Sequence, residues 1–458
     1  MAAALFITIN THAQWSAPAV LSMGPDTVSI NESMGTCIGV SKDTVHVIWN
    51  DKRNNTHAAI YYSRSIDTGL TWSAPIAITN TVVGNAWNPT IAVNGPNIHV
   101  AWREIDTLSG HRASWYKHSL DGGNTWSQSM YLDSTADWPA ISVSGTNVYI
   151  ANDRVVSQNP YNTEIFFMRS VDNGNTWSVP QRLTFAVGRS EDEAISAQGS
   201  HVHMAWNDNR EGKFQILYKE SSDYGVTWDS DRVVIDTSDY NTMVSIDDNH
   251  VDVVATGAPT GHFQLQLAQS ADTGATWAPS MDLSNDTAHA YFLPHMVRDS
   301  CKLHILVNSN GGPKYFHSAD GGATWDPAVA MAGCMFIAYS GDVLHVIYIN
   351  SAKLKYLRNP TGNGGPYCPL ISGELETNDR TSVIIYPNPN NGIFTLHSQI
   401  PILNSQLIIT DVLGREVYHQ EIINQQSSII NISHCNNGVY FYQLTDEKGS
   451  VRGRVVKD

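Results

Sequence analysis

The chain has 458 residues, of which 42% are hydrophobic, so it has enough apolar material for a sizeable core in about one to three domains. Its formal net charge of -16 argues against nucleic acid or an anionic membrane as a partner, because both attract basic surfaces. Five scattered cysteines without a CxxC pair argue against a zinc ribbon or a disulfide framework. No apolar run approaches the roughly 18 residues of a membrane helix, so we predict no transmembrane segment.

A short apolar run opens the chain. Residues 2–9 are mostly apolar, and polar residues then lead to Ala13-Gln14. This order is typical of the apolar region and cleavage site of a signal peptide, although the usual basic residues before it are missing. We predict a signal peptide over residues 1–14, with an ordinary first strand as the alternative.

The octapeptide pattern S-x-D-x-G-x-T-W recurs six times, and successive copies start 48 to 54 residues apart. In each copy the aspartate can accept hydrogen bonds from turn amides, the glycine permits a positive φ, and the tryptophan is a large apolar plug. We interpret each copy as a hairpin turn that joins two strands. Its aspartate is then structural, at Asp67, Asp121, Asp172, Asp223, Asp272 and Asp320.

A second motif, a five-residue strand of alternating character, recurs seven times, from VHVIW at 45–49 to LHVIY at 344–348. Five copies carry histidine at the same position. A recurring histidine is typical of packing inside a repeat rather than of metal binding, so we predict that role for His46, His99, His203, His304 and His345.

The two ends of the repeat array complement each other. The last unit ends at 353–359 without an octapeptide or a following strand, whereas residues 15–22 match the strand that follows the octapeptides. Pairing the two would remove two sheet edges. The repeats therefore predict an all-β, seven-bladed β-propeller over 15–359 that is closed by its N-terminal strand; six blades are the alternative.

The octapeptides resemble the Asp-box, or BNR, repeats of the sialidase superfamily. That resemblance implies a propeller, although sialidases have six blades. It also implies an arginine triad, a tyrosine nucleophile paired with glutamate, and an acid/base aspartate. None of these can be carried over, because the opening strand lacks arginine and later repeats hold Gly257, Asn308 and Asn350 where earlier ones carry Asp and Arg.

The C-terminal part has a different pattern. Residues 360–383 are rich in Pro, Gly and Asn and are predicted to be a linker. Residues 384–458 alternate like the short strands of a small β-sandwich. Their YPNP start, D-x-x-G-R turn and basic end resemble the C-terminal sorting domain of the Bacteroidetes type IX secretion system. This implies contact with the secretion machinery and a secreted or outer-membrane location; an adhesive immunoglobulin-like domain is the alternative.

Candidate ligand-binding residues follow the second strands or precede the first strands of the repeats, on the face opposite the octapeptides. Aromatic rings stack on sugar faces, and arginines and carboxylates hold hydroxyl or acid groups. The candidates are Asp51, Arg53, Trp87, Arg103, Glu104, Trp138, Asp153, Arg154, Glu191, Asp192, Glu193, Asp208, Arg210, Tyr240 and Tyr291.

Two groups of these candidates have alternative interpretations. Asp51 with Arg53, and Asp208 with Arg210, share a repeat position and can form local ion pairs. The acidic triplet at 191–193 has no counterpart in other repeats, and adjacent acids are costly unless they are solvated, paired or metal-bound. Calcium is conceivable, but no loop shows a recognisable ligand spacing, so we predict no metal site and no cofactor.

These features predict a secreted or surface propeller that binds an extracellular glycan or a surface protein without catalysis. The alternative is a sialidase-like or other glycoside hydrolase. Tyr240 and Tyr291 are possible nucleophiles for it, but neither has an evident glutamate partner.

Overall fold

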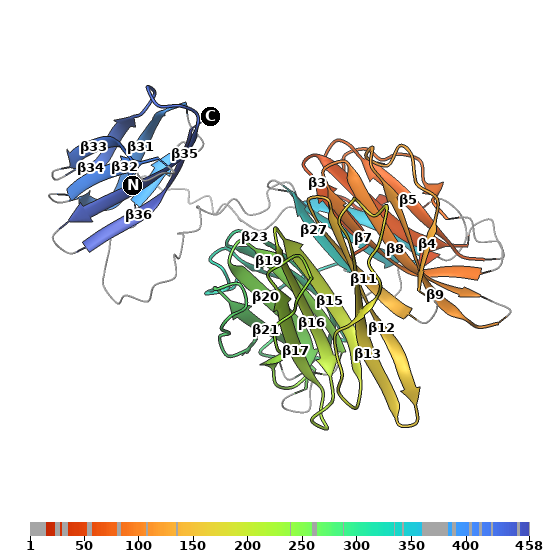
Figure 1. Ribbon diagram of the computed structural model, residues 1–458. Helices are drawn as coiled ribbons and strands as arrows, with labels where there is room; N and C mark the ends of the chain where they lie inside the picture. The colour runs from red at the N-terminus through yellow and green to blue at the C-terminus, as the bar shows by residue number, and fades with distance from the viewer. Residues whose placement is uncertain are drawn as a thin grey trace, which may run out of the picture. The chain divides into compact units, whose positions relative to one another are not determined.

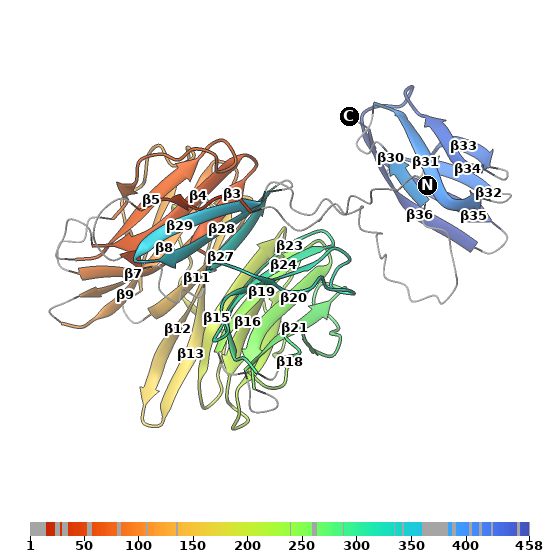
Figure 2. The ribbon, with the colours of Figure 1, turned by 180° about the vertical axis from the view of Figure 1, so that it is seen from behind.

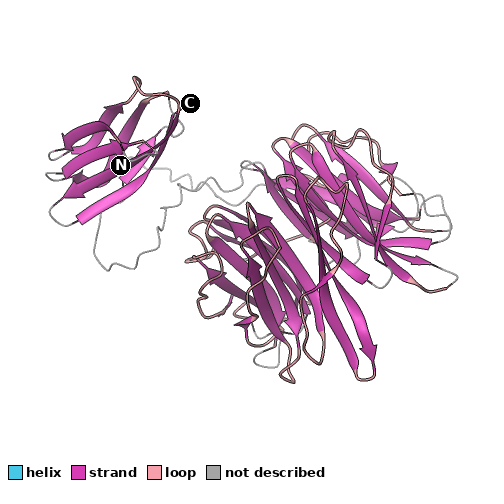
Figure 3. Ribbon diagram, in the orientation of Figure 1, coloured by secondary structure: helices cyan, strands magenta, loops and turns pink. Residues whose placement is uncertain are grey.

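The computed structural model divides into two compact units, Met1–Cys368 and Pro369–Asp458 (Figure 1). It describes residues 15–22, 28–29, 35–52, 57–79, 84–106, 109–133, 136–238, 240–258, 263–286, 288–333, 335–340, 343–359, 383–386, 391–402, 405–411, 415–422, 425–446 and 449–457. The predicted signal peptide and nearly all of the predicted linker lie outside these residues. The described residues form strands, turns and loops but no helix, and none of them forms a helix that could cross a membrane (Figure 3).

The first unit contains seven antiparallel sheets within its described residues, and six of them have four strands. The first sheet has a fifth strand and comprises β2 (Val28–Ser29), β3 (Ile38–Ser41), β4 (Thr44–Asp51), β5 (Ala59–Ser65) and β6 (Ile76–Ala77). The second comprises β7 (Gly84–Asn94), β8 (Asn97–Asp106), β9 (Arg112–Ser119) and β10 (Met130–Asp133). The third comprises β11 (Ala136–Ser144), β12 (Asn147–Gln158), β13 (Tyr161–Ser170) and β14 (Gln181–Arg182).

The remaining four sheets of this unit follow the same up-and-down order. The fourth sheet comprises β15 (Ser190–Gln198), β16 (His201–Asp208), β17 (Gln215–Ser221) and β18 (Arg232–Ile235). The fifth comprises β19 (Tyr240–Asp247), β20 (His250–Gly257), β21 (Gln264–Ser270) and β22 (Met281–Asp282). The sixth comprises β23 (Tyr291–Asp299), β24 (Lys302–Ser309), β25 (Lys314–Ser318) and β26 (Val329–Ala330). The seventh comprises β27 (Phe336–Ser340), β28 (Val343–Asn350), β29 (Lys353–Asn359) and the N-terminal strand β1 (Ala19–Val20).

The octapeptide turns all use the same set of hydrogen bonds. In the third sheet, Asp172 accepts bonds from the Thr176 amide at 2.9 Å, the Thr176 hydroxyl at 2.6 Å and the Ser170 hydroxyl at 2.7 Å. The amide of Gly174, whose φ is +84°, donates to Ser170 at 2.9 Å. The bonds from Thr176 and Ser170 lower the pKa of Asp172 to about 2. Each turn therefore rests on one ionised carboxylate that several donors satisfy.

Tryptophans of the octapeptides join successive sheets. Trp126 packs edge-on against Tyr62 of the preceding sheet, with ring centroids 5.1 Å apart. Trp177, Trp228 and Trp277 make the same contact with Tyr116, Phe167 and Tyr218. Each contact places a large apolar side chain in the space between two sheets, where its burial stabilises their packing.

The same contacts link the two ends of the array. Trp72 of the first sheet packs against Tyr356 of the seventh, at 4.8 Å, and the N-terminal Trp15 packs against Tyr315 of the sixth, at 5.7 Å. β1 pairs antiparallel with β29, with Ala19 opposite Tyr356. Each sheet has a first strand that packs against the first strand of the next sheet, in the order β3, β7, β11, β15, β19, β23 and β27. The last of these, β27, also packs against β3 (Figure 2).

The part of the second unit that the structure describes forms two antiparallel sheets. One comprises β30 (Val383–Tyr386), β31 (Ile393–Ile402) and β34 (Gln425–Asn431); the other comprises β32 (Ser405–Thr410), β33 (Glu416–Ile422), β35 (Gly438–Asp446) and β36 (Gly449–Lys457). Leu396 and Ile430 of one sheet share a core with Leu407 and Val455 of the other. At the D-x-x-G-R turn, the Arg415 side chain donates to Asp411 at 2.7 Å.

Candidate functional site

A cavity of about 760 Å³ opens in the first unit, where the first strands of several successive sheets begin. Its walls come from the second to the sixth sheet. The lining residues are Arg112, Asp137, Trp138, Asp153, Val155, Tyr161, Arg189, Glu191, Asp192, Asn241, Thr256, Phe263, Tyr291, Phe292 and Leu293. Aromatic rings, arginines and carboxylates thus share one concave surface.

A β-bulge in the first strands shapes this cavity. The pairing register shifts near the start of β7, β11, β15, β19 and β23. Each shift includes a non-glycine residue with positive φ, between +46° and +57°: Asn88, Trp138, Asp192, Asn241 and Leu293. Such a conformation costs about 1–2 kcal/mol per residue, and bulges re-aim side chains near functional sites. The acidic triplet at 191–193 thus keeps the backbone of the repeat while changing its side chains.

Asp137 and Asp153 face each other across β11 and β12. Directly opposed like charges are destabilising. Asp137 is neutralised by Arg103, at 2.6 Å, and by Arg112. Asp153 forms no such ion pair with an arginine of the described residues, and its Oδ1 atom is buried without a hydrogen-bond partner there. Burial, with Asp137, Asp192 and Glu191 nearby, raises the pKa of Asp153 to about 8, so this carboxyl holds its proton near neutral pH.

Glu193 lies behind the cavity surface. Its side chain is fully buried, and neither carboxyl oxygen has a hydrogen-bond partner within the described residues. Burial, followed by the charge of Asp153, raises its pKa well above the usual range. A buried unpaired carboxylate is too costly to stay ionised, so Glu193 holds its proton, as does Asp153 in the cavity lining.

Two further carboxylates of the cavity have partners. Arg189 donates to both oxygens of Glu191, at 2.9 and 2.6 Å. Asn207 donates to Asp192 at 3.2 Å. Burial, with the neighbouring Asp192 charge, still raises the pKa of Glu191. Both arginines that line the cavity, Arg112 and Arg189, are therefore already engaged by carboxylates.

The aromatic wall is held from behind. The guanidinium of Arg103 lies over the Trp138 ring, 4.7 Å from its centroid, while it also bonds Asp137. This fixes the plane of a ring that lines the cavity. On the other side, the β12–β13 hairpin is paired out to Gln158 and Tyr161, which carries Tyr161 to the cavity wall.

The cavity brings together five of the predicted binding residues, namely Trp138, Asp153, Glu191, Asp192 and Tyr291. The others do not line this cavity, and a ligand-binding role for them stays a prediction. Those outside the lining are Asp51, Trp87, Arg103, Glu104, Arg154, Glu193, Asp208 and Arg210. Arg53 and the side chain of Tyr240 lie outside the described residues.

Several residues outside the lining have local partners. Arg210 pairs with Asp208 at 2.7 Å and with Asp231 at 2.7 Å. Burial pushes the pKa of Asp208 upward, but bonds from Arg210 and Trp206 lower it overall. Arg154 pairs with Asp133, and Lys52 lies over the ring of Trp87. The structure thus contains the local ion pair that was the alternative for Asp208 and Arg210.

Sequence reasoning missed Arg112, Arg189, Tyr161, Asn241 and Phe263 as lining residues. The extra length between the second and third strands of the third repeat could have indicated that Tyr161 reaches the cavity. The partners of the Tyr291 hydroxyl are Asp286 and Lys314, each at 2.9 Å, in keeping with the expectation that it has no glutamate partner. The prediction of no metal site, with calcium conceivable at 191–193, stays a prediction.

A family model described as "BNR repeat-like domain" matches residues 5–305. The chain belongs to this BNR repeat-like family. A second model, the secretion system C-terminal sorting domain, matches residues 384–458, so this BNR repeat protein is secreted through the type IX system to the cell surface or beyond. No curated protein matches the chain.

Solved structures similar to this BNR repeat protein include several propeller enzymes. Polysaccharide lyase Uly1 is 11% identical, with 72% of this chain and 91% of that chain covered and a TM-score of 0.50. A Trypanosoma rangeli sialidase bound to 2,3-difluorosialic acid is 11% identical, with 93% and 83% covered and a TM-score of 0.43. The phage phi92 endosialidase is 10% identical, with 96% and 87% covered and a TM-score of 0.45. At these identities the likeness concerns the fold alone.

Proposed function

We propose that the cavity of this secreted BNR repeat protein binds an extracellular glycan built of neutral sugars. The observation that carries the proposal is the combination of Trp138, fixed on Arg103, with the carboxylates of Asp137 and Asp192 and the protonated carboxyl of Asp153 in one cavity. An aromatic ring offers a flat apolar face to a pyranose, and carboxylates accept bonds from its hydroxyl groups.

The charge of the cavity favours neutral over anionic sugars. Both arginines in the lining are paired, Arg112 with Asp137 and Arg189 with Glu191. Recognition of a sugar acid would need an arginine to leave its carboxylate, which would leave a partly buried charge unpaired. Hydroxyl groups need no such exchange, because they both donate and accept hydrogen bonds.

We propose further that the seven sheets are seven blades of a closed ring, completed by β1 in the last blade. The contact of Trp72 with Tyr356 repeats the contact between other successive sheets. Arg358 of the seventh sheet reaches Thr68 in the first octapeptide at 3.2 Å, as Arg169 reaches Tyr224 in the following sheet. A ring of this kind would hold four of the five bulged strand ends, those of β11, β15, β19 and β23, around one cavity.

A second function, glycoside hydrolysis, is favoured by the protonation of Asp153. A carboxyl whose pKa is about 8 can donate a proton to a leaving glycosidic oxygen. Asp192 lines the same cavity and can act as the second carboxylate that such hydrolysis requires. Water completes the hydrolysis by adding to the sugar carbon that the leaving oxygen vacates.

The binding proposal is tested on a glycan array that carries neutral, sialylated and uronate-containing oligosaccharides. The parent protein should retain neutral glycans. Trp138→Ala should raise the dissociation constant at least ~10-fold, which is a loss of about 1.4 kcal/mol of binding free energy. Trp87→Ala is the matched control, because Trp87 precedes the equivalent bulge of the second sheet but does not line the cavity. Equal losses in the two variants, or retention of anionic glycans alone, would refute the proposal.

Hydrolysis is tested on the retained glycan by release of reducing ends. Asp153→Asn should lower turnover at least ~100-fold, the contribution typical of a positioned general acid, and leave the dissociation constant within about threefold. Turnover that survives this substitution would remove Asp153 from the reaction.

A further inference from the structure

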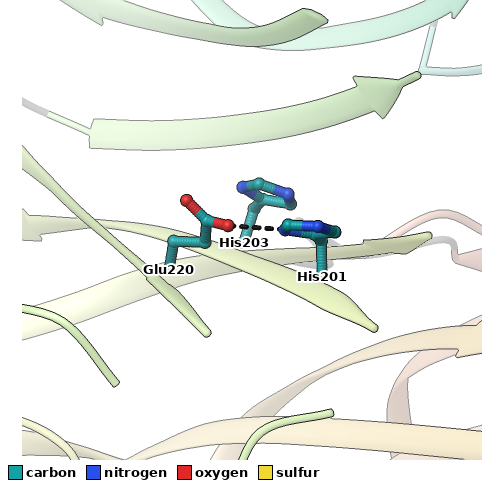
Figure 4. A group of neighbouring side chains, drawn as sticks. All are labelled: His201, His203 and Glu220. Atoms are coloured by element: carbon teal, nitrogen blue, oxygen red, sulfur yellow. Dashed lines mark hydrogen bonds and ion pairs between the residues drawn. The ribbon is translucent and has the colours of Figure 1, made fainter. Parts of the chain in front are cut away.

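A group of three metal-binding side chains lies away from the cavity, in the fourth sheet. His201 and His203 are two positions apart on β16 and so share one face of the sheet. Glu220 on β17 stands directly opposite His203. One donor atom from each residue lies within 4.8 Å of the others (Figure 4). The group occupies the start of β16, at the end of the sheet that carries the octapeptide turn.

Comparison with the other sheets shows what is unusual about Glu220. At the equivalent position, Arg169 donates to the Tyr224 carbonyl of the next octapeptide at 3.0 Å, and Gln269 donates to Gly321 at 2.8 Å. Arg64 and Arg358 reach the following octapeptides in the same way. A carboxylate cannot donate such a bond. Glu220 instead lies 2.6 Å from Nδ1 of His201, so the fourth sheet has acidic oxygen where four sheets have a donor.

His203 is prepared to act as a ligand. Its Nδ1 atom lies 2.6 Å from the Tyr218 hydroxyl, which itself donates to the Thr273 carbonyl at 3.5 Å. The hydroxyl therefore accepts from Nδ1–H, which leaves a lone pair on Nε2. This Nε2 atom is buried and has no hydrogen-bond partner among the described residues.

The second sheet provides an internal contrast. His99 makes the same bond to Tyr116, at 2.6 Å, and its Nε2 atom is also unpartnered within the described residues. Opposite it stands His118 rather than an acid. An unpartnered imidazole nitrogen is thus common to these sheets, and the convergence of a second histidine and a carboxylate upon it distinguishes the fourth.

We propose that His201, His203 and Glu220 bind a zinc ion. Two imidazole nitrogens and one carboxylate oxygen form a donor set that suits zinc, with water as the fourth ligand. The His201 side chain is 36% exposed, which leaves a path for the ion. Tetrahedral ligands lie about 3.3 Å apart, so small side-chain rotations suffice, and zinc replaces the bond between His201 and Glu220. The ion then ties β16 to β17 at the position where four other sheets use a side-chain donor to reach the next octapeptide.

The experiment uses the full chain without an affinity tag, freed of metal by a chelator and titrated with Zn²⁺ by calorimetry near pH 7. The parent should bind one ion per chain at this site. Glu220→Gln preserves shape and hydrogen bonding, and His201→Gln removes one nitrogen; each should weaken binding at least ~10-fold. The matched control is His118→Gln, at the position equivalent to Glu220 in the second sheet, and it should leave the affinity unchanged.

Melting temperature supplies a second measurement. Zinc should raise it in the parent and in His118→Gln but not in Glu220→Gln, while the zinc-free proteins should melt alike. A parent that binds no zinc at micromolar concentration would overturn the proposal. So would equal affinity in Glu220→Gln, or an equal loss in His118→Gln, because either would place the ion elsewhere.

Discussion

The two ends of the sheets in the first unit use the same residue type in opposite ways. At the octapeptide end, Asp172 is surrounded by donors, and its pKa is lowered to about 2. At the cavity end, Asp153 is buried among other acids, and its pKa is raised to about 8. The first arrangement stabilises the ionised carboxylate, and the second stabilises the protonated acid. The comparison teaches that the repeated end serves the scaffold, whereas acids that depart from the repeat gather in the cavity at the other end.

The largest expected effect tests the packing at the octapeptide end. Gly174 and Gly199 both have positive φ, +84° and +59°. A Cβ atom at Gly174 would lie 1.7 Å from the Tyr116 hydroxyl oxygen, whereas one at Gly199 would meet nothing within 4 Å. We expect Gly199→Ala to cost about 1–2 kcal/mol of unfolding free energy and Gly174→Ala to cost about 1–3 kcal/mol more.

Urea unfolding followed by tryptophan fluorescence measures this difference. All 13 tryptophans lie between positions 15 and 325, so the signal reports on the first unit alone. Equal destabilisation by the two substitutions would show that the turn glycines are required only for their backbone conformation.

The next effect tests the cavity end. The pKa of Asp153 is about 8 in the folded protein, against an ordinary value of 3.8. Between about pH 4 and pH 8 the folded protein therefore retains this proton, whereas the unfolded chain has released it. Its contribution to stability is therefore complete below about pH 4 and declines as the pH rises to 8. Asp153→Asn should remove this decline and stabilise the protein at pH 8 by on the order of 2 kcal/mol, a figure reduced for solvent screening at the cavity.

Melting curves at several pH values check this prediction. The variant and the parent should differ little at pH 4 and most at pH 8. A variant that is less stable than the parent at pH 8 would mean that Asp153 is ionised and paired in the folded protein.

The opposite pH dependence is expected at the octapeptide end. Asp172 has a folded pKa of about 2 against an ordinary 3.8, so its stabilisation is present above about pH 4 and lost as the pH falls toward 2. Asp172→Asn should therefore melt at a lower temperature than the parent at pH 6, with the gap narrowing by pH 2. A gap that stays constant over this range would assign the effect to shape rather than to charge. Differential scanning calorimetry gives both values.

The smallest effect concerns a single buried hydroxyl group. Tyr218→Phe removes the partner of His203 Nδ1 and should cost about 1 kcal/mol. Tyr131→Phe, at a half-exposed position, should change the unfolding free energy by less than about 0.5 kcal/mol. Urea unfolding measures the unfolding free energy of both variants. A smaller loss of unfolding free energy in Tyr218→Phe than in Tyr131→Phe would contradict the role given to the His203–Tyr218 bond.

Much of the scaffold could be predicted because its determinants are local and repeated. The hydrogen bonds of each octapeptide span at most four residues, so the pattern S-x-D-x-G-x-T-W carries its own turn geometry. The alternation of the strand motif marks a strand wherever it occurs. The match between residues 15–22 and the missing strand also indicated the pairing of β1 with β29.

The candidate site could be predicted only in part. Which first strands surround one cavity depends on how the sheets pack, so Trp138 lines it and Trp87, before the equivalent bulge, does not. The sequence places Arg112 and Asp137 25 residues apart, and nothing local indicates that they form an ion pair.

The sequence by itself determined the repeat, the strands, the turns and the sorting module, because each rests on neighbours along the chain. Only the tertiary structure decided the protonation of Asp153 and Glu193, because a pKa depends on burial and on charges that other strands bring close. The aspartates of the octapeptide carry their donors with them, and those of the cavity acquire their surroundings from the fold.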